Sequence, residues 1–134
     1  MISFLQAVET CLSEKYFTLS GRASRAEYWW FALATFLILV VLSSALGGVA
    51  VLYKSEGGML YMMLLLLLVL GILALAIPSV TVCVRRLHDT GRSGWWYLVN
   101  FVPYIGSLVL LVLLLLPSDP DENEYGAPYS APEA

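Results

Sequence analysis

The chain has 134 residues, of which 60% are hydrophobic and only 13% are charged. A soluble domain has about a quarter charged residues and could not hide so much apolar surface in one core, so the composition excludes an ordinary water-soluble protein. The net charge of −3 averages over basic and acidic residues that are segregated along the chain, and two cysteines are too few for a disulfide framework. We expect an all-α membrane protein, with a single transmembrane domain over residues 1–116 and a flexible, disordered acidic and Pro-rich tail over residues 117–134.

The first predicted element is a short amphipathic helix over residues 2–16. At about 100° per residue, Phe4, Val8 and Leu12 fall on one side of this helix, whereas serine, glutamine and threonine side chains fall on the other. The first basic residue is Lys15, so the segment lacks the positive start of a secretory signal. Two placements remain open, either in the membrane interface or docked against the rest of the protein.

Three uncharged apolar segments follow, and we expect each of them to be a transmembrane helix. About 20 apolar residues are enough to cross roughly 30 Å of hydrocarbon, and all three segments reach that length. The first helix has a predicted start, because Ser24 and Glu27 fit the S-x-x-E capping box, in which two side chains satisfy free backbone N–H groups. The three spans are expected at about residues 28–52, 59–84 and 94–116.

The third apolar segment has an alternative topology. Asn100, Pro103 and Gly106 cluster there, and proline removes a backbone hydrogen bond, so a broken helix is plausible. The segment could form a re-entrant hairpin that folds at residues 102–106 and returns the tail to the cytoplasm. Each limb would have only about 8 to 10 residues, which is too short for a crossing.

The basic residues predict the orientation of the chain. All but one of the seven lie before the first span or between the second and the third, and the positive-inside rule places both regions in the cytoplasm. Three crossings would then put the tail outside the cytoplasm. Each basic region also contains a Gly-Arg pair and two adjacent tryptophans, which we expect to anchor the helices at the interface. These interface anchors are Trp29, Trp30, Trp95 and Trp96.

Three strings carry a family resemblance: GRASRAEYWW at residues 21–30, RRLHDTGRSGWW at 85–96 and NEYGAP at 123–128. In this order and spacing they resemble the signatures of the YhaH-like inner-membrane proteins of bacteria, a family defined by a domain of unknown function. The resemblance implies a small multi-pass protein of the bacterial cytoplasmic membrane. It implies no activity.

A set of charged and polar residues at the predicted cytoplasmic face forms the candidate ligand-binding site. In one interpretation the arginines bind phosphates as anchors, while the carboxylates pair with them to fix helix ends. In the other, a basic pocket between helices binds an anionic lipid headgroup or another phosphate-like ligand, because the planar guanidinium makes paired hydrogen bonds to phosphate. The set consists of Arg22, Arg25, Glu27, Arg85, Arg86, His88, Asp89 and Arg92.

An enzymatic role is not expected. His88 and Asp89 are adjacent in a predicted turn, where neighbours rarely orient each other as an acid–base pair. His88 is the only histidine, and Cys83 alone would not complete a metal site. The string at residues 91–94 matches the one around the serine of rhomboid-type proteases, but four residues are a weak match, and Ser93 is better interpreted as a helix N-cap. We therefore expect no catalytic residue, no metal and no cofactor.

The expected function is that of a non-enzymatic binding or adaptor protein whose Arg-rich face contacts anionic lipid headgroups or a partner. No nucleic-acid partner is expected. The alternative is a component of a small oligomeric transporter or channel lined by Ser43, Ser44 or Ser107, although ion-coupled carriers place charged residues inside their spans and none lies here. Small residues on one helix face allow close packing, either within the chain or in a homo-oligomer. They are Ser43, Ser44, Gly47 and Gly48.

Overall fold

The computed structural model describes residues 2–53 and 58–128, and within them the chain is helical and contains no β-strand, as predicted. The connection at residues 54–57 and the end of the tail, residues 129–134, lie outside the described residues. The elements in chain order are α1, Phe4–Glu9; the π-helical turn η1, Thr10–Glu14; α2, Arg25–Tyr53; α3, Gly58–Asp89; the 3-10 helix η2, Gly94–Phe101; and α4, Gly106–Leu115.

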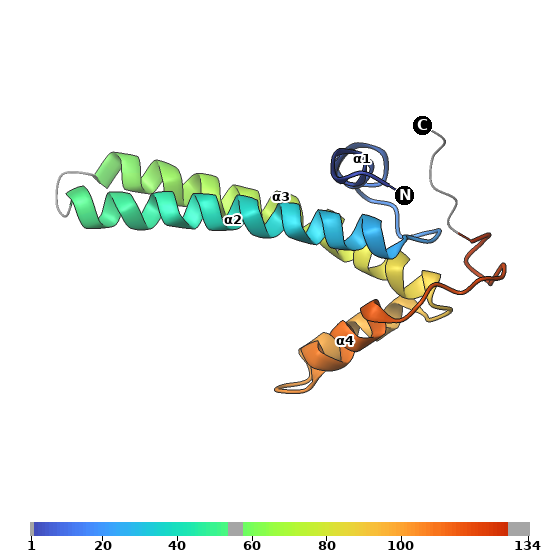
Figure 1. Ribbon diagram of the computed structural model, residues 1–134. Coiled ribbons are helices and arrows are strands. Elements are labelled where there is room, and N and C mark those ends of the chain that lie inside the picture. The colour runs from blue at the N-terminus through green and yellow to red at the C-terminus, as the bar shows by residue number, and fades with distance from the viewer. Residues whose placement is uncertain (1, 54–57, 129–134) are drawn as a thin grey trace.

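Helices α2 and α3 lie side by side along almost their whole length and form a long antiparallel pair (Figure 1). They are the two helices in the described residues that are long and apolar enough to cross a membrane, over Arg25–Leu52 and Gly58–Asp89. At about 1.5 Å per residue each is longer than the roughly 30 Å of bilayer hydrocarbon. Their outward faces carry exposed apolar side chains such as Val41, Leu66 and Leu73. The first two predicted segments are therefore found as helices of membrane length.

The start of α2 agrees with half of the predicted capping box. The backbone N–H of Glu27 donates to the Ser24 hydroxyl over 3.1 Å, so the serine caps the helix as expected. The carboxylate of Glu27 does not complete the box, because it pairs with Arg85 of α3 instead. The Glu27 side chain, which the sequence motif predicted to cap the helix, therefore binds the guanidinium of Arg85.

The third predicted span, residues 94–116, is a broken helix, which the cluster of Asn100, Pro103 and Gly106 made plausible. The segment forms η2, a turn at residues 102–105, and α4, which folds back along η2 (Figure 1). The turn reverses the chain at Tyr104, whose φ of 68° is left-handed and whose side chain is fully exposed. Gly106 then passes so close to η2 that a Cβ there would lie 1.9 Å from the carbonyl oxygen of Val99. We call residues 94–115 the C-terminal hairpin.

The limbs of the C-terminal hairpin are too short to cross a bilayer. Eight residues of 3-10 helix extend about 16 Å, and ten residues of α-helix extend about 15 Å. Each limb therefore covers about half of the hydrocarbon thickness. This is the shape of the re-entrant alternative, and both of its ends lie near the end of α3.

The tail, predicted to be flexible, makes defined contacts over residues 117–128. The backbone N–H of Asp119 donates to the carbonyl of Asp89 over 2.8 Å, and the side-chain amide of Asn123 donates to the carbonyl of His88 over 3.1 Å. These contacts place the tail against the end of α3, beside the segment that precedes α2. The tail was predicted to lie apart from the Arg-rich regions, and residues 117–128 instead contact them. The physical reason is that the hairpin returns the chain to the end from which it started.

The N-terminal helix is docked against the rest of the protein, which agrees with one of its two predicted placements. Ser3 caps α1 in a reciprocal box with Gln6, and Ala7 and Cys11 are fully buried against the protein. The ring of Phe4 meets Trp30 of α2 edge-on, with centroids 5.8 Å apart. The helical part ends at Glu14, two residues short of the predicted end.

Candidate functional site

Three arginines and two carboxylates of the predicted set meet in the interior of the protein, where none is more than 5% exposed. They come from the segment before α2, the first turn of α2 and the end of α3. The sequence predicted arginines that face phosphates, and the burial of these three was not foreseen. We call this group the arginine cluster, and it consists of Arg22, Glu27, Arg85, Arg86 and Asp89.

One half of the arginine cluster joins α3 to α2 and to the N-terminal helix. Arg85 and Glu27 form an ion pair of 2.5 Å with no exposure of either side chain. The sulfur of Cys11 accepts from Arg85 at 3.7 Å, and its thiol donates to Glu27 at 3.9 Å. Burial, with the negative charge of Glu27 as a second cause, raises the pKa of the Cys11 thiol to about 11. Cys11 is therefore a neutral thiol that contacts both members of this ion pair.

Asp89 organises the other half of the arginine cluster. Its carboxylate accepts from Arg22 over 2.9 Å, and it also accepts from Arg86 and from the hydroxyl of Ser118. Each of its oxygens is therefore engaged by a donor. Asp89 orients two guanidinium groups and a tail residue, and the neighbouring imidazole of His88 is not among its partners.

Arg22 holds the acidic tail through the tail's backbone rather than through its carboxylates. Beyond Asp89, its guanidinium donates to the carbonyl of Asp121 over 2.8 Å and to the carbonyls of Asp119 and Gly126. All three nitrogens of the group are used. Arg22 is therefore saturated by internal acceptors and has no free edge for a phosphate.

Arg86 closes the end of α4. It donates from Nε to the carbonyl of Leu114 over 3.2 Å and from Nη2 to the carbonyl of Leu116, while Nη1 reaches Ser118 over 3.2 Å. The last carbonyls of a helix have no partner within the helix, and a cation there also opposes the negative end of the helix dipole. Arg86 therefore ties the C-terminal hairpin to the end of α3.

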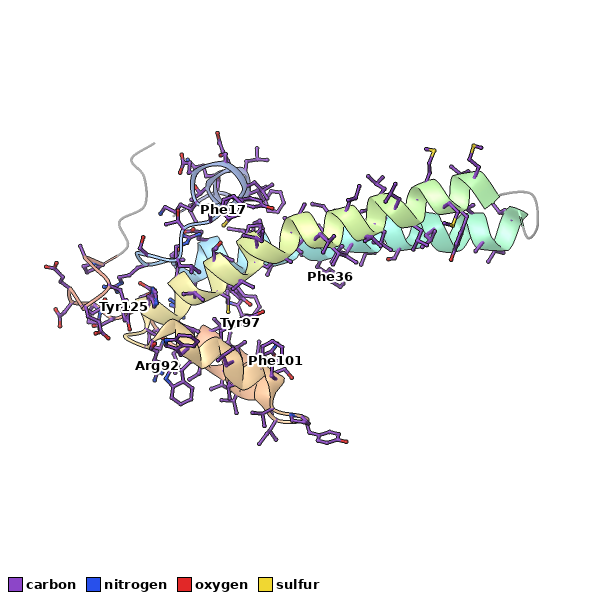
Figure 2. The ribbon with its side chains drawn as sticks, turned by 180° about the vertical axis from the view of Figure 1, so that it is seen from behind. Phe17, Phe36, Arg92, Tyr97, Phe101 and Tyr125 are labelled. Atoms are coloured by element: carbon purple, nitrogen blue, oxygen red, sulfur yellow. The ribbon has the colours of Figure 1, made fainter. Side chains whose placement is uncertain are left out.

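The other predicted site residues lie around the arginine cluster. Arg25 is exposed, and Arg92 is half-buried with one nitrogen donating to the carbonyl of Thr90 over 3.0 Å. The Nδ1 atom of His88 lies 3.2 Å from the carbonyl oxygen of Gly21, and its ring stacks on Tyr125 at a centroid distance of 3.9 Å. Figure 2 shows Arg92 and Tyr125 at the same end of the molecule. Arg25 and Arg92 are the two arginines of the set that keep an accessible surface.

The repeated Gly-Arg string has a structural explanation. Gly21 and Gly91 have φ values of 83° and 70°, which are left-handed and suit glycine. Each therefore makes a tight turn, and a helix begins a few residues later at Arg25 or Gly94. The tryptophans that follow are partly exposed, by 37% to 78%. Trp95, the most exposed, sits one residue inside η2, whose N-cap is Ser93 as predicted.

The described residues contain no group of three or more metal-binding side chains. The Ser93 hydroxyl accepts from the backbone N–H of Trp95 over 3.4 Å, which is the contact of a helix cap. The sequence missed two members of the site. Cys11 carried no signal, because a lone cysteine reads as a small apolar residue, and Ser118 lies in a tail whose composition indicates disorder.

Residues 16–127 match the model of a family described as a protein of unknown function, DUF805. The chain belongs to this family. It is 42% identical over 115 residues to the inner membrane protein YhaI of Escherichia coli strain K12, covering 84% of this chain and 86% of that protein. It is 36% identical over 116 residues to the inner membrane protein YhaH of the same strain, covering 84% and 88%.

A more distant relative is the uncharacterized protein YiiR of the same strain, which is 30% identical over 94 residues, 66% of this chain and 53% of that protein. No solved structure matches the chain. The names of the relatives and the two long apolar helices agree, and the chain is an inner-membrane protein of this family.

Proposed function

We propose that the chain is a non-enzymatic binding protein that crosses the membrane with α2 and α3 and holds the arginine cluster at the cytoplasmic face. There it contacts anionic lipid headgroups through Arg25 and Arg92. The observation that carries this proposal is the difference in burial among the five arginines. Three are buried on internal partners, and the two with accessible surface each lie within a few residues of an exposed pair of tryptophans.

The buried arginines support the proposed site without touching its ligand. They fix the N-terminal helix, the C-terminal hairpin and the tail to one end of the α2–α3 pair. Arg25 and Arg92 lie on separate turns, and both can contact the lipid headgroups only if the two turns keep a fixed spacing. The buried ion pairs maintain that spacing. The indole rings favour the interface, and nearby cationic side chains favour the negatively charged leaflet.

A direct test is the amount of phosphatidylglycerol that stays bound to the purified protein, measured by native mass spectrometry. We expect the variant Arg25→Gln/Arg92→Gln to retain several-fold less than the parent, since each basic residue near the surface contributes about 1 kcal/mol. The matched control Arg25→Lys/Arg92→Lys keeps both charges and should retain most of the lipid. Equal retention by the glutamine variant and the parent would overturn the proposal.

A second candidate is a component of a small oligomeric transporter or channel. It is favoured by the small residues of α2, because a Cβ at Gly47 or Gly48 would meet no described residue within 4 Å, and Ser43 and Ser44 are exposed. This surface is free to contact a second copy. We expect Ser44→Cys to form a disulfide-linked dimer in membranes, and Ser43→Leu to abolish any solute flux in reconstituted liposomes. Monomeric protein with no flux would dismiss this candidate.

A further inference from the structure

A cleft of about 400 Å³ lies in the angle between α3 and the C-terminal hairpin, with part of α2 at one end. Every long apolar element contributes to its wall. Figure 2 shows Tyr97 of η2 in this angle, facing α3. The volume falls within the range of small-molecule sites, which are mostly apolar with a few well-placed polar groups.

Five hydrogen-bonding side chains line the cleft among its leucines: Tyr28, Ser79, Tyr97, Asn100 and Ser107. Ser79 donates to the carbonyl of Leu75 within its own helix. The other four have no hydrogen bond to a protein group in the part of the chain that the structure describes. No charged side chain is among the lining residues. The cleft is therefore uncharged, and four of its polar side chains have no hydrogen-bond partner among the described residues.

The polar groups lie at hydrocarbon depth in the proposed membrane placement. Ser79 precedes Arg85 by six residues of helix, or about 9 Å, and Ser107 precedes the carbonyl of Leu114 that binds Arg86 by about 10 Å. Water is absent at that depth, and a polar group without a partner in lipid is unfavourable. An intramembrane group of this kind marks a candidate functional site.

We propose that this cleft binds a neutral, carbonyl-bearing, lipid-soluble molecule that enters sideways from the bilayer. Two phenol hydroxyls, a serine hydroxyl and the amide of Asn100 all donate hydrogen bonds, and carbonyl oxygens accept them. The uncharged lining disfavours a phosphate or a carboxylate in the cleft. The ester carbonyls of a glycerolipid and the ring carbonyls of a quinone share this chemistry. The site is independent of the headgroup contact above, because no arginine lines it.

The test uses the full chain in vesicles of phosphatidylethanolamine and phosphatidylglycerol. One arm contains a trace of photoactivatable diacylglycerol and the other a trace of photoactivatable quinone, and labelled peptides are mapped by mass spectrometry after illumination. We expect at least one probe to label residues 97–111 selectively, and the probe that does so identifies the source of the carbonyl. Labelling by both probes would show that the carbonyl alone is recognised, which also supports the proposal.

Two variants and one control make the outcome decisive. Asn100→Leu/Ser107→Ala removes two partners and should lower the labelling by roughly tenfold, while Tyr97→Phe keeps the ring and should lower it by roughly threefold. The exposed-face variant Ser44→Leu should label like the parent, and all proteins should have the same circular dichroism. Labelling that is spread evenly over the exposed helices, unchanged in folded Tyr97→Phe and Asn100→Leu/Ser107→Ala, or absent with both probes would overturn the proposal.

Discussion

Arg22 and Asp89 lie 67 residues apart in the sequence, and their side chains form a buried ion pair of 2.9 Å. This contact joins the segment that leads into α2 to the last residue of α3. Asp89 is shared with Arg86, so one carboxylate offsets two guanidinium groups. The end of the α2–α3 pair is therefore held by charges that have little access to water.

Replacing Asp89 should be the most destabilising single change in the arginine cluster. Asp89→Asn leaves Arg22 and Arg86 without their shared counter-charge, and removing one partner of a buried pair costs about 3–5 kcal/mol. The free energy of unfolding in detergent, measured by denaturant titration, checks this. Glu14→Gln removes an exposed carboxylate and serves as the control. A variant of Asp89 as stable as that control would contradict the role assigned to the cluster.

Cys11 should resist alkylation in the folded protein. Its thiol is fully buried, and a pKa of about 11 rather than 9.0 reduces the thiolate, the reactive form, by roughly 100-fold. The Cys83→Ala background isolates this residue. We expect N-ethylmaleimide to label the single-cysteine protein slowly at neutral pH and rapidly after denaturation. Rapid labelling of the folded protein would mean that the N-terminal helix is not docked.

Gly106 should not tolerate a side chain. The Cβ of Gly106→Ala would fall 1.9 Å from the carbonyl oxygen of Val99, so the limbs of the C-terminal hairpin must separate, at a cost of about 1–3 kcal/mol. Gly47→Ala is a matched control, because no atom of the described residues would lie within 4 Å of its Cβ and alanine favours a helix by up to about 1 kcal/mol. Thermal unfolding followed by circular dichroism should separate the two. If both variants melt alike, the hairpin geometry is wrong.

The exposed carboxylates of the tail should oppose binding to anionic lipid. Asp121, Glu122 and Glu124 lie at the same end as Arg25 and Arg92. Changing the three to their amides should raise the retention of phosphatidylglycerol, by up to about fivefold for each charge at low salt. High salt should diminish the gain, because it screens exposed charges. A gain that is insensitive to salt would point to a cause other than charge.

The helices α2 and α3 could be predicted because a run of apolar residues determines them locally. The C-terminal hairpin was predicted only as the alternative to a third span, because the close approach of Gly106 to Val99 cannot be seen in the sequence. An apolar run of 23 residues reads as a span whether or not it folds back. The sequence pattern thus predicts which segments are apolar, whereas tertiary packing determines whether such a segment runs straight or folds back.

The arginine cluster was predicted as a set of residues but not as a buried one. The motifs brought Arg22 and Arg85 to one membrane face, yet their partners lie 58 or more residues away in the sequence. For the tail, an acidic composition indicates disorder because that prediction considers only the side chains. The contacts with Arg22 use backbone carbonyls beyond Asp89, and any sequence offers those.

Our central proposal is that the segment before α2 and residues 117–128 lie on the same side of the membrane, with the C-terminal hairpin entering and leaving by one face. The most direct measurement fuses green fluorescent protein to the N-terminus of the full chain in one strain and to its C-terminus in another. This reporter fluoresces in the cytoplasm and stays dark when it is exported unfolded. We expect both fusions to fluoresce, whereas a bright N-terminal fusion with a dark C-terminal fusion would show that residues 94–116 cross the bilayer.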